Sequence, residues 1–586
     1  MISARFDDLR PRRRRSFRLD RPVGTIEART IAEVPSAIDA AERAVASGRW
    51  VGGWVSYESA PAFDDALVVR PTSGTPLADL PLVWFGVFEG RTPTSEPSGD
   101  HRLGSWVPTV DGERHRAGVE RIRRHIQAGE TYQVNHTFRM HAPFTGDPAD
   151  LYRRLSRAQS CGYGAHLDAG RWAVASASPE LFFEWRHGRL MSKPMKGTAR
   201  RGLDLISDEE QRHWLQTSEK NRAENLMIVD MVRNDMGRVA VTGSVSVPEM
   251  FTTEKYDTVW QLTSTVAART RSGTELLDVF GALFPCASIT GAPKVATMAI
   301  IAELEADPRG VYCGAIGFGG PGPAGPEWAF NVGIRTVLVD RTADTAWYGT
   351  GGGVTYDSTP EGEYQEALLK AEVLARHTTR FELLETMRWT PADGFHHLDR
   401  HLRRLSDSAW YFDIPLDTAE VRTALHRAIA RLDAPTRVRL TVDRAGWVQV
   451  STEPAPRSPT RPIMVAIDDV PIPRHDPFLR HKTTVRRVYE EAAARHPGAE
   501  DVILINEHGD VTETTIANLA ARVDGQWRTP PIESGCLPGV ERSALIGRGT
   551  LVEKPISLAD LHRADSLARL NSLRGWEPLR LAKPSA

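Results

Sequence analysis

One lysine of this sequence lies where its amine could do chemistry. Lys196 stands between a proline and a glycine in the segment 192–198. The alternating apolar run before it, 181–185, and the turn at His187-Gly188 predict a β-hairpin that leads into a short, stiff loop. An uncharged lysine held in such a loop can act as a nucleophile. Taken alone, however, the pattern fits an anion-binding or solvent-exposed lysine better.

Three carboxylates form a second candidate group. Glu224 lies beside an apolar stripe in the region 207–235, where a carboxylate is rare unless it is paired or binds a cation. Glu363 and Glu366 fall on one face of a predicted helix, together with Lys370. These charges form either an exposed ladder or, through Glu366 and Glu224, a site for a hard cation bound by carboxylate oxygens.

Other residues could bind anions. Thr290 and Gly291 form a turn before a predicted helix, and the free N–H groups at such a helix start suit an anion, although the signal is weak. Arg335 is a lone cation in an apolar run, so we expect it to have an anionic partner. Lys482 follows His481, a pair that is more often surface charge than a site.

The surrounding pattern predicts the elements that must position these residues. Helices are expected at 36–47 and 115–128, and a strand at 131–137. Ser207 and Glu210 have capping-box spacing and are expected to open one long helical region. Strands at 309–317 and 329–339 are expected to flank a loose loop, 319–326. Thr359 is a good N-cap for the helix of Glu366, with proline in its first position.

Composition changes near 376–380, a polar stretch that suits a domain junction. A strand is expected at 381–388, a helix at 398–405, and a strand at 502–506. The segment 451–462 carries four prolines and reads as a linker or crossing segment.

Bulk properties indicate a globular chain of two to four domains. It has 586 residues, 41% apolar and 25% charged, with a net charge of −2. This small net charge gives no electrostatic attraction of the whole protein to nucleic acid or membrane. No apolar run is long enough to span a membrane. The basic run 10–15 is interpreted as a solvated arm. The four cysteines are widely spaced without a metal pattern, so we expect a reducing, cytoplasmic location.

Residues 50–377 resemble the chorismate-utilising enzymes, a family that includes anthranilate synthase, isochorismate synthase and aminodeoxychorismate synthase component I. Eight motifs in order carry the resemblance: 132–135, 178–180, 194–198, 223–235, 288–294, 312–317, 331–336 and 351–370. Anthranilate and isochorismate enzymes usually have a small residue where this chain has Lys196, whereas the aminodeoxychorismate enzymes have lysine. The resemblance implies an α/β sandwich with large antiparallel sheets.

The resemblance to chorismate-utilising enzymes also implies roles for individual residues. Lys196 would attack C2 of chorismate, and Glu180 would protonate the hydroxyl that leaves C4. Mg²⁺ would bind Glu224 and Glu366, with Glu363 beside it or bound through water. The two carboxylates of the substrate would be held by Thr290, Gly291, Tyr312, Arg335, Gly353 and Lys370. Gln261 stands where many members have histidine, and because glutamine cannot titrate, only a positioning role remains there.

Residues 380–586 resemble fold-type IV pyridoxal-phosphate enzymes, which include aminotransferases and aminodeoxychorismate lyase. The matching segments are 384–388, 401–405, 481–482, 513–518 and 535–542. The resemblance implies that Lys482 binds the cofactor as a Schiff base and that Glu513 pairs with its ring nitrogen. Arg404, Asn518, Gly539 and Val540 complete the cofactor-binding set, and Glu541 is expected to point away from the phosphate.

Together the two resemblances predict an α+β chain with domains at 1–377 and 380–586, the second with subdomains 380–457 and 463–586. The expected function is conversion of chorismate and ammonia to 4-aminobenzoate through 4-amino-4-deoxychorismate. No cysteine lies in a glutaminase setting, so ammonia would come from a separate glutamine amidotransferase subunit or from solution. A homodimer would form through the second domain. The alternatives are another chorismate synthase fused to an aminotransferase, and a non-catalytic scaffold.

Overall fold

The computed structural model describes residues 2–10, 15–94, 97, 99–159, 161–374 and 380–582. It divides into two units, Met1–Arg200 with Gln211–Thr378, and Arg201–Glu210 with Thr379–Ala586. Of the expected junction 376–380 only Arg380 is among the described residues, and residues 11–14 of the basic run are also outside them.

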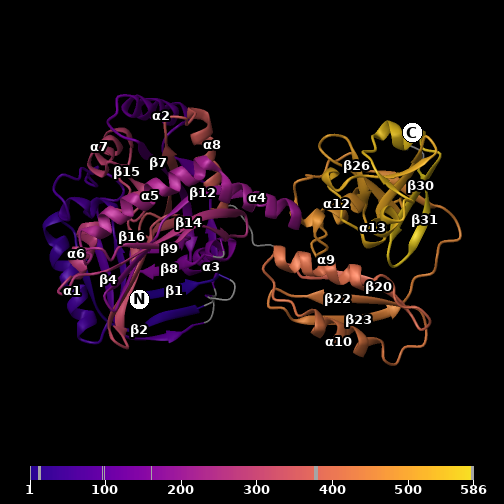
Figure 1. Cartoon of the computed structure of the whole chain (residues 1–586), viewed down its shortest axis with the longest axis horizontal. Coiled ribbons are helices and arrows are strands. Elements are labelled where there is room, and N and C mark those ends of the chain that lie inside the picture. The colour runs from indigo at the N-terminus through magenta and orange to yellow at the C-terminus, as the bar shows by residue number, and fades with distance from the viewer. Residues whose placement is uncertain are drawn as a thin grey trace. The chain divides into compact units, whose positions relative to one another are not determined.

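Strands of the first unit pair antiparallel in one long ladder (Figure 1). In order of pairing they are β13 (Ser246–Lys255), β14 (Val259–Arg269), β11 (Arg189–Lys193), β10 (Leu181–Arg186), β17 (Gly325–Val332), β16 (Ala315–Gly322), β3 (Trp50–Val55), β4 (Val83–Pro93), β2 (Arg15–Ala28), β1 (Ser3–Asp8), β8 (Tyr163–Asp168), β9 (Trp172–Ser178), β18 (Thr336–Asp340), β19 (Thr345–Val354) and β7 (Gln133–Gly146). Four short strands join it: β12 (Met195–Arg200) on β14, and β5 (His101–Leu103), β6 (Val107–Pro108) and β15 (Gly291–Ala292) on β7.

The ladder folds over on itself. Trp54 and Trp84 from β3 and β4 share one buried cluster with Trp172 and Leu338 from β9 and β18, although several strands separate the two pairs along the ladder. Apolar faces of strands in the middle of the ladder and of strands further along it therefore meet, which is the packing of a sandwich. The predicted fold class is confirmed.

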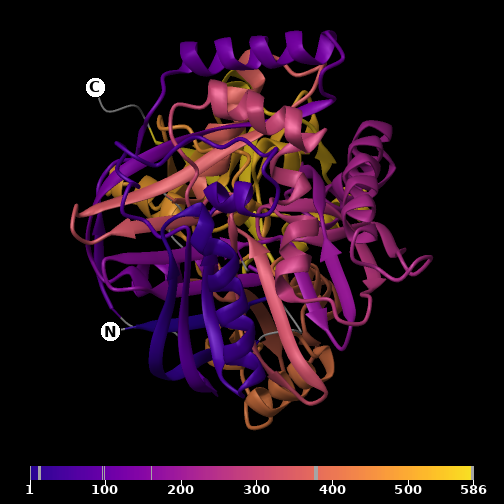
Figure 2. The ribbon, with the colours of Figure 1, turned by 90° about the vertical axis from the view of Figure 1, so that its left-hand side faces the viewer.

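Helices cover this sandwich. The first, α1 (Val34–Ala46), packs across β2, β3, β4 and β16 (Figure 2). The helix α5 (Glu219–Gly237) packs on β12 and β14, while α8 (Pro360–Ala371) packs on β19 and against α2 (Gly112–Gln127). The remaining α-helices of this unit are α3 (Pro148–Gln159), α6 (Leu276–Leu283) and α7 (Lys294–Leu304).

Three local predictions differ from the structure. The helical region from 207 is broken into α4 (Leu205–Thr217) and α5, because the Ser218 side chain caps a new helix by accepting from the Asn221 N–H. Ser207 does not open α4; Asp204 precedes the helix, and its Oδ1 accepts from the Ser207 N–H at 2.9 Å. The expected loose loop at 319–326 is instead the paired end of the β16–β17 hairpin.

Two sheets form the second unit. A small antiparallel sheet has the order β21 (Gly394–Phe395), β20 (Leu383–Thr390), β22 (Thr436–Val442) and β23 (Val448–Pro454), with α9 (Leu398–Tyr411) against β20 and α10 (Thr418–Ile429) against β23 (Figure 1). A larger mixed sheet has the order β26 (Val511–Thr514), β25 (Asp501–Ile505), β24 (Ile463–Ile467), β31 (Gly575–Leu581), β30 (Ser566–Asn571), β27 (Asn518–Val523), β28 (Gln526–Thr529) and β29 (Val552–Glu553). Its helices are α11 (Pro477–Arg480), α12 (Arg487–Arg495), α13 (Val540–Gly547) and α14 (Leu558–Arg563).

Within the described residues, none of the helices has the length and apolar character needed to cross a membrane.

Candidate active sites

A β-bulge presents Lys196. Strand β12 pairs with β14 so that Met195 faces Thr263 and Thr198 faces Gln261, which leaves one extra residue on β12. Such a bulge bends the strand and re-aims its side chains. The hairpin predicted before Lys196 is present, with positive φ at both turn residues. The lysine itself lies on this bulged strand and not in a loop.

Carboxylates and a close backbone surround the lysine amine. Its Nζ lies 4.0 Å from Glu224 Oε2, and 16% of the side chain is exposed. A Cβ added to Gly353 would lie 2.6 Å from Lys196 Nζ and 2.2 Å from Gln133 Nε2, so only glycine fits at this end of β19. Burial lowers the pKa of Lys196, although Glu224 favours the charged form. At a given pH, a larger fraction of Lys196 is therefore neutral than of a surface lysine.

Asn225, which sequence reasoning did not single out, holds the Lys196 backbone. Its Nδ2 donates to the carbonyl oxygens of Lys196 and Leu262, each at 3.3 Å, and its Oδ1 accepts from Ser264 Oγ at 2.6 Å. The side chain is buried. A buried amide with all three bonds in place fixes the bulge relative to α5. The available signal was an asparagine next to Glu224 in an apolar stripe.

Glu180 is a buried acid between β9 and β10. Only 3% of the residue is exposed, and its Oε1 has no hydrogen-bond partner. Burial raises the pKa of Glu180 to about 7, against opposing hydrogen bonds from Ser288 and the Met195 N–H. Near neutral pH this carboxyl therefore holds a proton that it can donate. Ser288 is a second residue that sequence reasoning did not assign.

The face of α8 gathers the other predicted charges. Lys370 Nζ lies 2.8 Å from Glu366 Oε1 and donates to the Gly351 carbonyl at 2.9 Å. Ser358 Oγ donates to Glu363 Oε1 at 2.6 Å. A Cβ on Gly352 would lie 2.8 Å from Glu363 Oε2, so these side chains reach the glycine end of β19.

This donor set suits Mg²⁺ chemically. Glu224, Glu363 and Glu366 offer carboxylate oxygens, the ligands that hard divalent ions prefer. Lys370 lowers the pKa of Glu366, which keeps it ionised, whereas burial raises the pKa of Glu363. Among the described residues, the groups whose ligand atoms lie within 4.8 Å of one another do not include these glutamates. The residues fit the ion by type of ligand.

The side chain and the N–H of Thr290 make their hydrogen bonds within its own turn. Thr290 Oγ1 donates to the Cys286 carbonyl at 3.1 Å, and its N–H bonds the Ala287 carbonyl. Gly291 has φ 137°, and an added Cβ would lie 2.0 Å from the Gln133 carbonyl oxygen. The glycine thus allows β15 to pair tightly with β7.

The remaining predicted substrate ligands are mostly buried. Tyr312 is 6% exposed, and its ring lies against Gly349, where a Cβ would come within 2.3 Å. Arg335 donates from NH1 to Gln159 Oε1. Gln261 Oε1 accepts from Thr198 Oγ1 at 3.0 Å, which is a positioning contact beside the bulge.

In the second unit the charges of Lys482 and of the buried carboxyl of Glu513 interact with each other. Burial lowers the pKa of Lys482 to about 8, and burial raises the pKa of Glu513 to about 7. Glu513 accepts from Tyr489 Oη at 2.8 Å and from Asn518 Nδ2 at 3.1 Å. Tyr489 was not predicted, since nothing local marks it. The carboxyl is held rigidly, as a partner for a ring nitrogen must be.

Arg404 belongs to a buried ion group on α9 and β20. Its Nε and NH2 donate to Glu385 at 2.9 and 2.6 Å, and His401 Nδ1 lies 2.6 Å from Glu385 Oε2. Burial opposes ionisation of Glu385, but Arg404 and His401 outweigh it and lower its pKa to about 2. Arg404 NH1 donates to the Pro538 carbonyl at 3.2 Å, in the loop before Gly539.

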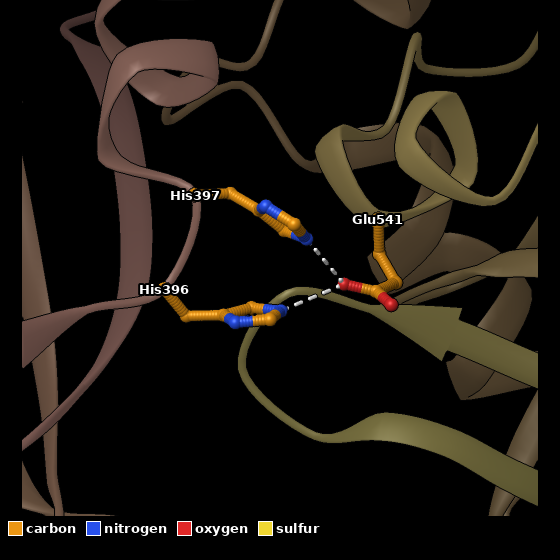
Figure 3. A group of neighbouring side chains, drawn as sticks. All are labelled: His396, His397 and Glu541. Carbon is orange, nitrogen blue, oxygen red and sulfur yellow. Dashed lines mark hydrogen bonds and ion pairs between the residues drawn. The ribbon is translucent and has the colours of Figure 1, made fainter. Parts of the chain in front are cut away.

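That loop is shaped to hold an anion at the start of α13. A Cβ on Gly539 would lie 1.8 Å from Asn518 Oδ1, so the backbone needs glycine there, and Val540 is the first residue of the helix. Glu541 Oε2 is contacted by His396 Nε2 at 3.0 Å (Figure 3). Lys482, Glu513 and this glycine cradle fit pyridoxal phosphate.

Comparison with known proteins finds a matching family model for each unit. The family model for chorismate binding enzymes matches residues 11–376. The chain belongs to this family. The model for class IV amino-transferases matches residues 382–582, and a domain of that class implies a pyridoxal phosphate cofactor. The two predicted resemblances are confirmed.

Curated relatives of this chorismate binding enzyme include aminodeoxychorismate synthases and anthranilate synthase component 1. Component 1 from Klebsiella aerogenes is 40% identical over 45% of this chain and 58% of its own length. Aminodeoxychorismate synthase from Streptomyces griseus is 44% identical over 44% of this chain and 35% of its own. The chain therefore spans less than two thirds of these relatives. A solved anthranilate synthase component I from Streptococcus pneumoniae has 24% identity and a TM-score of 0.53, covering 61% of this chain and 92% of its own, and shows the shared fold.

Proposed function

We propose that this chain makes 4-aminobenzoate in two steps, amination of chorismate to 4-amino-4-deoxychorismate and then elimination of pyruvate. The observation that carries the proposal is the buried Lys196 amine beside Glu224, with Glu180 as a carboxyl acid of raised pKa in the same unit. The names of the curated relatives support the first step. The class IV domain on the same chain supports the second.

In the first step the neutral amine of Lys196 forms a bond to C2 of chorismate, the two conjugated ring double bonds shift, and the C4–O bond breaks. Glu180 gives its proton to the departing hydroxyl, which leaves as water. Ammonia then bonds to C4, the double bonds shift back, and the C2–N bond to Lys196 breaks. A proton lost from the incoming nitrogen restores Glu180, so the sum is chorismate plus ammonia giving product plus water.

Charge placement supports this sequence. Mg²⁺ on Glu224 and Glu366, with Glu363 beside it, would bind the ring carboxylate and neutralise two anions next to the lysine. Lys370, Arg335 and Tyr312 are the groups available for the second carboxylate. Gly352 and Gly353 allow the backbone at the end of β19 to lie close to Glu363 and Lys196, where a Cβ would clash.

In the second step pyridoxal phosphate supplies an electron sink for breaking the C4–H bond. Lys482, with a pKa near 8, would bind the cofactor and then take the C4 proton of the substrate. Glu513 would orient the ring through its nitrogen, because Tyr489 and Asn518 hold both carboxyl oxygens. Gly539, Val540 and Arg404 would hold the phosphate. Loss of pyruvate then leaves an aromatic ring.

The nitrogen would come from a separate glutaminase subunit. Cys161, Cys286, Cys313 and Cys536 are all buried, and burial raises the pKa of each thiol; for the last three it reaches about 12. A glutaminase needs an activated thiolate, which these environments disfavour.

Product analysis tests the whole proposal. Purified chain with chorismate, Mg²⁺, pyridoxal phosphate and ¹⁵N-ammonium should yield 4-aminobenzoate and pyruvate, with the label in the aromatic amine. Amide-labelled glutamine should give no labelled product with the pure chain. Anthranilate or isochorismate as the product would contradict the assigned chemistry, and labelled product from glutamine would reveal a glutaminase site in this sequence.

The first step should have a bell-shaped pH profile. Activity should rise with pH as Lys196 loses its proton, and fall above about 7 as Glu180 loses the proton that it must donate. The rate should be measured at constant free ammonia, because ammonium itself titrates. Glu180→Gln should be slower by about 10²–10⁴-fold and lack the fall at high pH. A flat profile across neutral pH would show that Glu180 is not the acid.

Glu366→Gln should weaken Mg²⁺ binding and chorismate turnover together, by at least about tenfold, since it removes one of the two proposed anionic ligands. Calorimetric titration of Mg²⁺ checks this. Glu361→Gln is the matched control: it lies on the same helix, 59% exposed, paired with Arg116. An unchanged Mg²⁺ dissociation constant in Glu366→Gln would leave Glu366 as part of a helix charge ladder only.

A further inference from the structure

A group of two histidines and one glutamate in the second unit has no role in either proposed reaction. His396 and His397 lie in the turn between β21 and α9, and Glu541 lies in the first turn of α13. Figure 3 shows both imidazole rings directed at the same carboxylate. Two segments far apart in the sequence thus bring three metal-ligating side chains to one point.

Distances within the group match those between ligands of a small metal ion. Glu541 Oε2 lies 3.0 Å from His396 Nε2 and 3.4 Å from His397 Nε2, and each of the three side chains places one ligand atom within 4.8 Å of the others. Tetrahedral zinc with bonds of about 2.0–2.1 Å separates its ligand atoms by roughly 3.3–3.4 Å. Small side-chain movements would therefore suffice for coordination.

A second observation distinguishes this group from an ordinary ion pair. His397 Nε2 is shielded from solvent and makes no hydrogen bond, although it points to the centre of the group. Its only ion-pair contact within the group is the 3.4 Å approach to Glu541 Oε2, and a buried ring nitrogen without a hydrogen bond costs free energy unless something binds it. The other such group among the described residues, Asp468, Asp469 and His496, is explained without a metal, because Arg495 donates to both oxygens of Asp468.

We propose that His396, His397 and Glu541 bind one divalent transition metal, Zn²⁺ by its ligand preference. Imidazole nitrogens favour zinc over magnesium, and two histidines with one glutamate form a three-ligand set that leaves a fourth position for water. The ion would join the start of α9 to the start of α13, next to Gly539 and Val540. It would also neutralise Glu541, whose charge is otherwise unfavourable near a bound phosphate. Zinc binding does not depend on the proposed function.

Zinc titration of the full-length holoenzyme tests this site. The protein is treated with EDTA, dialysed, and supplied with excess Mg²⁺ so that oxygen-ligand sites are filled before Zn²⁺ is added. The parent should bind one equivalent more Zn²⁺ than the double variant His396→Ala/His397→Ala, and Glu541→Gln should bind it at least tenfold more weakly. His562→Ala removes an exposed histidine of the same unit and should match the parent.

Two further measurements keep the test decisive. Circular dichroism and cofactor absorption of the double variant should equal those of the parent, which excludes unfolding as the cause of lost binding. Co²⁺ should give the visible bands of a four-coordinate ion in the parent and in His562→Ala, and these should be absent from the double variant. Equal zinc stoichiometry and affinity in parent and double variant, or no saturable binding by the parent, would overturn the site.

Discussion

Replacing Lys196 by alanine is expected to stop amination of chorismate while the fold survives. The substitution removes the amine that forms the bond to C2, so the rate should fall by at least about 10³-fold. Alanine fits the bulge sterically, and Asn225 would still hold the backbone through its bonds to the carbonyls. Single-turnover assays with chorismate and ammonium, followed by chromatography of the products, measure the loss.

Lys193→Ala provides a matched control. Lys193 is the last residue of the neighbouring strand β11, and its amine pairs with Glu254, a residue without an assigned role in the proposed chemistry. This variant should aminate chorismate at close to the parental rate. Full activity in a folded Lys196→Ala protein would remove Lys196 from the role of nucleophile and leave it as an electrostatic partner of Glu224.

Replacing Lys482 by alanine is expected to separate the two reactions. The first unit should still aminate chorismate, and 4-amino-4-deoxychorismate should accumulate because the group that binds the cofactor and takes the C4 proton is gone. The loss of 4-aminobenzoate formation should be at least about 10³-fold. The purified variant should also lack the visible absorption of a lysine-bound cofactor. Mass spectrometry of the products and an absorption spectrum measure both effects.

Lys554→Ala is the control for this unit, because Lys554 is exposed and lies outside the cofactor site. It should retain both the absorption band and the product. If borohydride reduction of Lys482→Ala still fixed the cofactor to the chain, another lysine would carry it. Accumulated 4-aminobenzoate with no intermediate would show that the elimination does not need Lys482.

Local patterns in the sequence predicted much of what positions the sites. The His187-Gly188 turn, the cap at Thr359 and the alignment of Glu366 with Lys370 were all predicted, and the structure has each of them. These features depend on residues a few positions apart, whose geometry the backbone sets directly. The two resemblances likewise followed from short ordered motifs.

Contacts between distant segments were decided only in the tertiary structure. The bulge at Lys196 arises from pairing with β14, more than sixty positions along the chain, and the break before α5 from the cap at Ser218. The sequence did not predict that Glu385 binds both Arg404 and His401, because these contacts join a strand to a helix.

Residue types, spacing and the two resemblances therefore predicted which chemistry this chain could carry: a lysine beside carboxylates, and a second lysine with a cofactor set. Tertiary packing decided how those groups are tuned. Burial lowers the pKa of Lys196 and raises that of Glu180, and burial is a property of the whole fold that no local pattern contains.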